Sequence, residues 1–214
     1  MVEYKKTPVI NTHSGLQVNP LDLKESDIRI IDIAHSLSMI NRFNGHTIKP
    51  INVAQHSVYV ARIVSKILEQ EHNCDKYHCI QCGHNRLIEL QALFHDAAEA
   101  YLGDVTKWLK HSDAMAPFRE AEHRAEQVIM KYLNCPLDQH ELVTYADKMM
   151  VVYEAKMGFE PPYIIEHPLY KELSSEELEL IGPWDFWKQK ESKTFFLDHL
   201  RMLTNATNRE IGIV

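Results

Sequence analysis

Residues 93–104 of the chain read LFHDAAEAYLGD, an apolar helical pattern that contains an adjacent histidine and aspartate. Apolar side chains recur three or four residues apart through this region, which predicts a helix with one buried face. Glu99 lies one turn after His95 on the same predicted face, so its carboxylate would reach a water held near that histidine. Gly103 is suited to end the helix in a left-handed conformation, and Asp104 is suited to cap the next short helix.

Two further polar residues, His56 and Asp147, occur in similar apolar settings. Valines and an isoleucine stand three, four and seven residues from His56, so helical spacing directs its imidazole inward. Val143 and Met150 do the same for Asp147. A buried carboxylate is costly unless another group compensates for its charge. A metal ion is one such group, and an arginine or lysine partner is the alternative.

These residues form an ordered group that we call the His–Asp set: His56, His95, Asp96 and Asp147. Two imidazoles and two carboxylates suit one divalent cation such as Mn²⁺, Fe²⁺, Co²⁺ or Zn²⁺, with Mg²⁺ as a further candidate. Such a cation lowers the pKa of a bound water to about 7 and supplies hydroxide at neutral pH. The sequence therefore predicts a metal site built from separate helices.

The His–Asp set and its surroundings resemble the HD-domain metal-dependent phosphohydrolases. The chain looks most like their small 5'-deoxynucleotidase-like branch, which includes phage and prophage members. The resemblance runs from the N-terminal hairpin to Leu203 and includes Pro183-Trp184 before a final helix. The other stretches that carry it are DIAHSLS (32–38), RFNGHT (42–47), VAQHS (53–57), residues 94–104 with Lys110, and Ala146-Asp147.

The resemblance implies that the His–Asp set binds the metal and that Glu99 orients or deprotonates the attacking water. Asp104 matches an acidic residue near the reacting group. Taken alone, Glu99 also fits a surface carboxylate that faces a lysine, and Asp104 fits a simple helix cap.

The resemblance also implies how the substrate is held. Arg42 matches an arginine that contacts the substrate phosphate, and Phe43 stands where these enzymes carry an aromatic side chain beside the sugar or base. A guanidinium fork suits phosphate oxygens. Lys110 is a second phosphate partner or a solvated lysine, and His46 either touches phosphate or is an ordinary loop histidine.

The reaction implied by this resemblance is metal-assisted hydrolysis of deoxyribonucleoside 5'-monophosphates to nucleoside and phosphate. One alternative is a deoxynucleoside triphosphate triphosphohydrolase, for example acting on dATP, which would release triphosphate. Hydrolysis of guanosine tetraphosphate-type alarmones is a weaker option. A non-catalytic nucleotide-binding scaffold with the HD fold is the alternative from a different class of protein.

Composition limits the other classes of function. The chain has 214 residues, of which 45% are hydrophobic and 25% charged, as in a globular domain. Only seven glycines are present, without a Walker or dinucleotide-binding pattern, which disfavours a kinase or a nicotinamide enzyme. A formal net charge of −7 disfavours binding to duplex nucleic acid.

The expected setting of the protein follows from similar observations. Residues 1–8 lack the apolar core of a signal peptide, and no apolar run is long enough to span a bilayer. We therefore expect a cytoplasmic protein, in a bacterium or a phage-infected host, without a membrane partner. Relatives often form dimers or rings, so the resemblance implies a homo-oligomer.

Three cysteines cluster between the His56 and His95 helices, at a place where relatives have a shorter connection. Cys79 and Cys82 form one knuckle that is typical of a structural zinc site, with Cys74, His84, His72 or His78 available to complete four ligands. A second knuckle is missing. The alternative is a polar loop with free thiols, which suits a reducing compartment.

The remaining pattern predicts a mostly α protein, an HD-domain helical bundle with a small N-terminal β-hairpin. The hairpin is predicted because residues 9–18 alternate about a Ser14-Gly15 turn. We expect one domain over 1–214, with a hairpin segment (1–25), a Cys/His-rich insert (72–85) and a C-terminal arm and helix (160–214). Helices are predicted at about 30–42, 52–71, 86–102, 117–134, 138–157 and 185–203, with a short one near Ser175.

Overall fold

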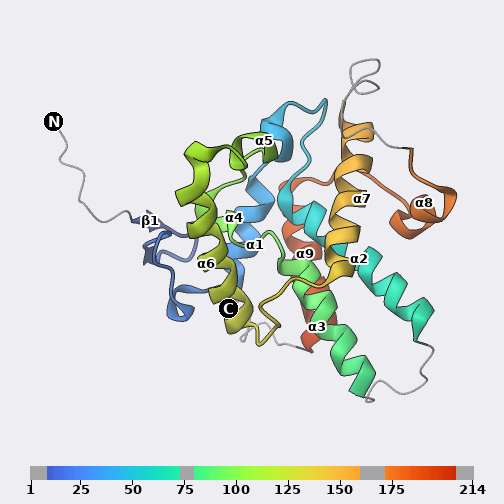
Figure 1. Ribbon diagram of the computed structural model, residues 1–214, viewed down its shortest axis with the longest axis horizontal. Coiled ribbons are helices and arrows are strands. Elements are labelled where there is room, and N and C mark those ends of the chain that lie inside the picture. Colours follow the sequence, from blue (N-terminus) through green and yellow to red (C-terminus); the bar gives the residue numbers. More distant parts are fainter. Residues whose placement is uncertain (1–8, 73–79, 160–171, 206–214) are drawn as a thin grey trace.

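The computed structural model describes residues 9–72, 80–159 and 172–205, and these residues are mostly helical (Figure 1). This confirms the predicted fold class, including the small N-terminal hairpin. The elements are β1 (Ile10–Asn11), β2 (Gln17–Val18), η1 (Glu25–Asp27), α1 (Ile30–Met39), η2 (Arg42–Gly45), α2 (Val53–Glu71), α3 (Ile80–Phe94), α4 (Glu99–Leu102), α5 (Lys107–Lys110), η3 (Asp113–Met115), α6 (Ala116–Tyr132), α7 (Glu141–Gly158), α8 (Ser175–Ile181) and α9 (Gln189–Thr204).

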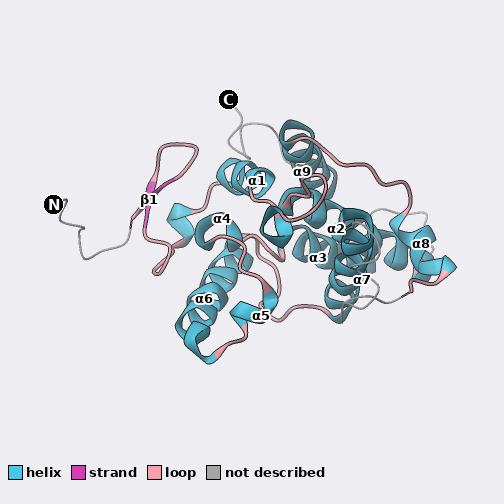
Figure 2. Cartoon of the chain, turned by 90° about the horizontal axis from the view of Figure 1, so that it is seen from above, coloured by secondary structure: helices cyan, strands magenta, loops and turns pink. Residues whose placement is uncertain are grey.

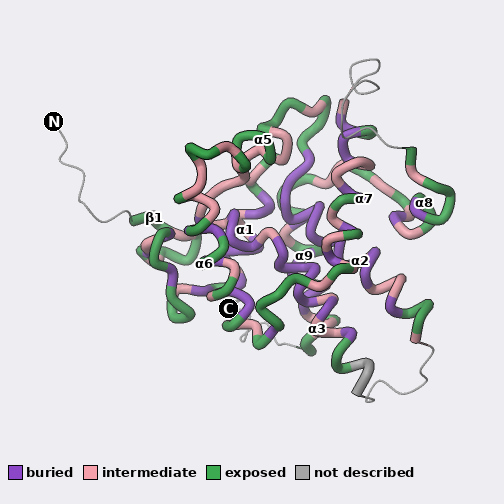
Figure 3. The backbone as a smooth tube through the Cα atoms, viewed as in Figure 1, coloured by how far each residue is buried: buried purple, intermediate pink, exposed green. Residues whose placement is uncertain are grey.

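Helix α2 is the centre of the bundle and packs against α1, α3, α7 and α9 (Figures 1 and 2). Residues 53–61 of this helix are all buried, and buried residues gather in the middle of the molecule (Figure 3). Phe94 of α3 and Phe196 of α9 meet edge to face in this core, with ring centroids 5.1 Å apart. Full burial of one such side chain stabilises a fold by roughly 1.5–3 kcal/mol. The polar His56 is fully buried within this core.

The N-terminal hairpin is short and is attached to α1. Ile10 pairs with Val18 and Asn11 with Gln17, around a turn in which Gly15 has a φ of 88° that glycine tolerates best. The backbone N–H and hydroxyl of Ser14 both donate to the Asp32 carboxylate, at 2.6 and 2.7 Å. Two charge-assisted hydrogen bonds therefore fix the hairpin to the first helix.

The predicted helix 30–42 ends earlier than expected, at Met39. The chain beyond it pairs with the residues that lead into α2, through an antiparallel bridge between Asn41 and Asn52. The N–H of Arg42 donates to the carbonyl of Ile51 at 2.8 Å. Because these backbone groups are used across the loop, the helix cannot continue, and Arg42 begins the separate turn η2.

The predicted helix 86–102 is two helices, α3 and α4, separated by a turn over residues 95–98. The N–H of Ala97 bonds to the carbonyl of Phe94, and the N–H of Glu99 bonds to the carbonyl of Asp96, each at 3.0 Å. These i to i+3 bonds tighten the backbone relative to an α-helix. The predicted continuous helix is therefore interrupted between His95 and Glu99, but both residues are buried on the inner side as expected.

The other helices differ from the prediction at their ends. The predicted 117–134, 138–157 and 185–203 correspond to α6, α7 and α9, and the short helix near Ser175 is α8. Helix α7 begins later because the Gln91 amide binds the carbonyls of Pro136 and Asp138 and holds that segment as a loop. Asp104 does not cap α5, since the residue that precedes this helix is Thr106.

The predicted zinc site lies outside the described residues, since these exclude Cys74, Cys79 and the side chain of Cys82. Cys135 is a buried free thiol, and burial raises its pKa to about 11. Across 9–72, 80–159 and 172–205, no helix combines the length and the apolar character that crossing a membrane requires.

Candidate metal centre

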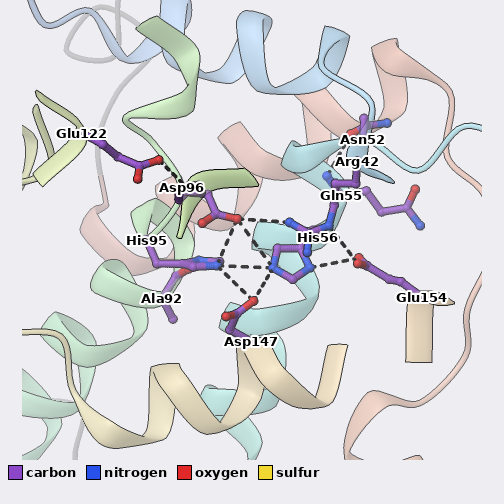
Figure 4. Close-up of polar contacts among 11 residues, drawn as sticks. Arg42, Asn52, Gln55, His56, Ala92, His95, Asp96, Glu122, Asp147 and Glu154 are labelled. Carbon is purple, nitrogen blue, oxygen red and sulfur yellow. Dashed lines mark hydrogen bonds and ion pairs between the residues drawn. The ribbon is translucent and has the colours of Figure 1, made fainter. Parts of the chain in front are cut away.

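The His–Asp set, which comes from α2, the turn after α3, and α7, meets at one point (Figure 4). Nε2 of His56 lies 3.3 Å from Nε2 of His95 and 3.1 Å from Oδ1 of Asp147. Nε2 of His95 lies 3.3 Å from Oδ2 of Asp96 and 3.8 Å from Oδ1 of Asp147. The atoms of His56, His95 and Asp96 are close enough to share one metal ion. The structure therefore brings the four predicted ligands together.

The outer nitrogen of each imidazole faces a hydrogen-bond acceptor. Nδ1 of His56 lies 3.0 Å from Oε1 of Glu154, and Nδ1 of His95 lies 2.8 Å from the carbonyl oxygen of Ala92. In its neutral form, each ring would donate from Nδ1 to that acceptor, and the lone pair of Nε2 would then face the centre. Two lone pairs and two carboxylates then converge, and such a group of acceptors fits a cation. Metal-binding histidines usually have this arrangement of an outer acceptor.

The pKa values of the protein groups show how strongly this centre favours positive charge. Burial disfavours a charged imidazole, but Asp96 and Asp147 outweigh burial and raise the pKa of His95 well above its usual range. Burial opposes ionisation of Asp147 as well, yet hydrogen bonds and positive charge from the protonated forms of His56 and His95 hold its pKa below the usual range. The carboxylates of this centre therefore favour positive charge beside them.

Glu99 lies beside this centre at the start of α4. The residue is buried, with 5% of its surface exposed, and Oε2 has no hydrogen-bond partner within the part of the chain that the structure describes. Burial and the charges of Asp96 and Asp104 raise the pKa of Glu99 well above its usual range. Burial also raises the pKa of the half-buried Asp104. The two carboxylates therefore compete for protons at the edge of the metal centre.

Arg42 reaches into the centre from η2. Its Nε donates to Oε2 of Glu154 at 2.9 Å, and a terminal nitrogen donates to Oδ2 of Asp96 at 3.2 Å. Burial opposes the charged form, but Glu154 and Asp96 outweigh it and raise the pKa of Arg42 above its usual range. Arg42 therefore stays cationic beside the metal centre, and a guanidinium has five N–H donors, more than these two contacts use.

The turn that carries Arg42 has an unusual backbone. Phe43 and Asn44 have φ values of 55° and 51°, in the left-handed region that non-glycine residues rarely adopt. The ring of Phe43 packs edge to face on Phe159, with centroids 5.4 Å apart. The N–H of Ile48 donates to the carbonyl of Gly158 at 2.8 Å, which joins the loop to the end of α7. The end of α7 thus supports both Arg42 and Phe43.

The remaining predicted site residues lie further from the metal centre or have other partners. His46 is exposed, and its backbone N–H, rather than its side chain, donates to the carbonyl of Phe43. The Lys110 ammonium forms an ion pair with Glu122 at 2.7 Å. This lysine is close enough to act electrostatically on Glu99, so it contributes positive charge to the same side of the site.

His56 is positioned by the beginning of α2, which is fixed to the C-terminal part of the chain. The Asn52 side chain accepts from the N–H of Gln55 at 2.9 Å and donates to the Ser192 hydroxyl of α9 at 2.8 Å. The Gln55 amide donates to the carbonyl of Asp185 and accepts from the N–H of Trp187. These buried contacts hold the first turn of α2 and therefore the imidazole that follows it.

Glu154 is the residue of this centre that sequence reasoning missed. It is fully buried and contacts both His56 and Arg42. One signal was available, because Glu154 lies seven residues after Asp147 and so on the same face of a helix, two turns away. A carboxylate at that spacing on a buried face requires a cationic partner or a hydrogen-bond donor.

Known proteins resemble this chain over the region that builds the centre. Residues 30–150 match the profile of the family described as 5'-deoxynucleotidase YfbR-like. Uncharacterized protein YfdR of Escherichia coli K12 is 32% identical over 147 residues, which are 69% of this chain and 70% of that protein. An uncharacterized protein of Rhodobacter capsulatus is 34% identical over 94 residues, 43% of this chain and 41% of that protein.

The matched family region spans more than half of the chain and contains every residue of the centre except Glu154. A family of this HD type implies a divalent metal, and the structure offers a site for one at His56, His95 and Asp96. The chain belongs to the YfbR-like 5'-deoxynucleotidase family of the HD-domain superfamily.

Proposed function

We propose that this protein is a metal-dependent phosphohydrolase that converts deoxyribonucleoside 5'-monophosphates to nucleoside and phosphate. The observation that carries the proposal is the convergence of the two Nε2 atoms with Asp96 and Asp147, beside the cationic Arg42. In this proposal the whole His–Asp set holds one divalent metal. When bound, that metal would polarise the phosphoryl group and activate a water.

The protein groups then have separate tasks. Arg42 holds non-bridging phosphate oxygens with the N–H groups that Glu154 and Asp96 do not use. Glu99 accepts a proton as the water oxygen attacks phosphorus and the bond to the sugar oxygen breaks. Its raised pKa makes it a stronger base than an ordinary carboxylate. The leaving sugar oxygen takes a proton from the Glu99 and Asp104 pair, so the proton count is balanced.

The charge of the site supports a monophosphate over a triphosphate. Asp104 and Glu99 stand beside the His–Asp set, and Lys110 is already paired with Glu122. A triphosphate carries about two more negative charges than a monophosphate and would need more cations than this acidic surrounding offers. The aromatic ring of Phe43, supported by Phe159, provides an apolar contact for the sugar or base.

The proposal is tested with full-length protein and a panel of ribo- and deoxynucleoside mono-, di- and triphosphates, each with Mn²⁺, Co²⁺, Zn²⁺ or Mg²⁺. We expect inorganic phosphate from deoxynucleoside monophosphates, and its loss in His95→Ala and Asp96→Ala. Release of tripolyphosphate from a dNTP would establish the triphosphohydrolase alternative instead. Metal-loaded protein that hydrolyses none of these nucleotides would reject an enzyme of this class. The cytoplasmic location, the single domain and the homo-oligomer remain predictions.

A further inference from the structure

Glu154 connects the metal centre to the substrate-binding arginine. Its Oε1 lies 3.0 Å from Nδ1 of His56, and its Oε2 accepts from Nε of Arg42 at 2.9 Å. Arg42 in turn donates to Asp96, which faces the imidazoles of the His–Asp set. The four side chains thus form a closed path, and Glu154 has no surface in contact with solvent.

The two histidines of the centre differ in how they are oriented. A backbone carbonyl, that of Ala92, accepts from His95, so side-chain substitution cannot remove it. The orientation of His56 instead depends on one side chain, Glu154. A carboxylate accepts on both oxygens, so the same group can receive the imidazole proton and the guanidinium proton at once.

We propose that Glu154 is a positioning residue that keeps the proton of His56 on Nδ1 and holds Arg42 against Asp96. This inference rests on the proposed function in one respect, namely that Arg42 binds the substrate phosphate. With Nδ1 protonated, Nε2 of His56 faces the metal as a lone pair. One buried carboxylate thereby sets both the affinity for the metal and the placement of the phosphate.

The substitution Glu154→Gln separates this role from simple space filling. Glutamine has nearly the same shape but offers one acceptor oxygen and one donor nitrogen. If its oxygen faces Arg42, its NH₂ faces Nδ1 of His56 and moves the imidazole proton to Nε2, toward the metal. If its oxygen faces His56, its NH₂ opposes a donor of Arg42. Either orientation breaks one of the two contacts.

The test uses full-length protein loaded with Co²⁺, whose visible absorption reports the geometry of the bound ion. Competition with a chelator measures the metal affinity, and phosphate release from a deoxynucleoside monophosphate gives KM and kcat. We expect Glu154→Gln to bind Co²⁺ about 10- to 100-fold more weakly, the range for loss of a group that orients a metal ligand. We also expect a higher KM at saturating metal.

A matched control is Glu177→Gln, which changes another buried carboxylate, on α8, where it accepts from Ser174 and Tyr145. Its Co²⁺ affinity and KM should stay within twofold of the original protein. Glu154→Asp keeps both acceptors and should recover part of the lost affinity. It also replaces the glutamine variant in the comparison if thermal melting shows that Glu154→Gln does not fold.

Unchanged Co²⁺ affinity, absorption and KM in a folded Glu154 variant would overturn the proposal. This outcome differs from failure of the proposed function. If the proposed function fails, the original protein will bind Co²⁺ and hydrolyse no nucleotide. The effect of Glu154 on Co²⁺ binding can still be measured then.

Discussion

Glu99 is ionisable and yet buried, and among the described residues one of its oxygens has no hydrogen-bond partner. Burial of such a group disfavours folding, since the carboxylate loses its water without a full replacement. A residue that costs stability in this way is expected where chemistry requires it. Single residues of this chain are therefore best tested by measuring stability and activity together.

The first residue-scale prediction concerns Glu99→Gln. We expect phosphate release to fall about 10²- to 10⁴-fold, because general-base assistance is lost. The melting temperature should stay the same or rise, because the amide avoids the cost of a buried charge. Initial rates and thermal melts on the same preparations check both parts. A kcat within tenfold of the original value would contradict the role given to Glu99.

A second residue-scale prediction concerns His199 of α9, which is buried with Nε2 unpaired within the described part of the chain. Burial, with a smaller effect of Arg62, lowers its pKa to about 4. An unfolded histidine has a pKa of about 6.5, so the unfolded state takes up the proton first as pH falls. The stabilising effect of the neutral ring is therefore complete above pH 6.5 and is lost between about 6.5 and 4.

The lost stability amounts to about 3 kcal/mol from this residue, since each pKa unit corresponds to about 1.4 kcal/mol. Urea unfolding at pH 7, 5.5 and 4.5 measures it, with His199→Leu as the comparison. Between pH 7 and 4.5 the difference between the two proteins should shift by about 2.5 kcal/mol in favour of the leucine variant, and the rest of the loss lies below pH 4.5. A pH-independent difference would show that His199 is not held neutral.

At the scale of elements, the close approach of α7 to the loop after η2 controls how Arg42 is presented. Gly158 closes α7 against this loop, and an added Cβ would lie 2.6 Å from Cγ2 of Thr47 and 3.1 Å from Cδ1 of Ile51. The same glycine accepts a backbone hydrogen bond from Ile48. Because the loop continues into η2, a shift at this contact is transmitted to the turn that carries Arg42.

We predict that Gly158→Ala destabilises the protein by about 1–2 kcal/mol and raises KM. Overpacking costs typically 1–3 kcal/mol, which exceeds the gain of up to about 1 kcal/mol from helix propensity. Thr47→Ser removes the methyl group nearest the new Cβ, so the double variant should recover part of the loss. Urea unfolding and KM measurements test this. A double variant no better than Gly158→Ala would place the strain elsewhere.

At the scale of the whole molecule, the metal centre depends on the C-terminal segment, which lies beside the beginning of α2 although it is more than 120 residues away in sequence. Gln55 has no exposed surface and satisfies two backbone groups of that segment. An unsatisfied buried polar group costs about 1–3 kcal/mol. This single amide therefore connects the first turn of α2 to the segment that precedes α9, at the residue next to His56.

We predict that Gln55→Leu lowers the free energy of unfolding by about 2–4 kcal/mol, because two backbone groups lose their partners. It should also weaken Co²⁺ binding, since the next residue, His56, is a proposed metal ligand. Gln189→Leu, an exposed change at the start of α9, is the control and should stay within about 0.5 kcal/mol. Equal stability of the two leucine variants would contradict the structural role of Gln55.

The periodicity of the sequence was sufficient to predict the mostly helical class, the hairpin, and the inward direction of His56 and Asp147. These properties depend on neighbours within about one turn, and local spacing is enough to predict them. The residue types of the His–Asp set likewise indicated a cation, because few other groups satisfy two imidazoles and two carboxylates together.

Other features depended on contacts between distant segments, and only the tertiary structure decided them. The early end of α1, which presents Arg42, follows from backbone hydrogen bonds to the segment that leads into α2. The break after Phe94 is made by local i to i+3 hydrogen bonds, but the apolar spacing alone does not distinguish it from a continuous helix. Glu154 looked like any helical glutamate until folding placed His56 and Arg42 on either side of it. A residue's pattern reports whether it is buried, but its partners come from elements that are remote in sequence.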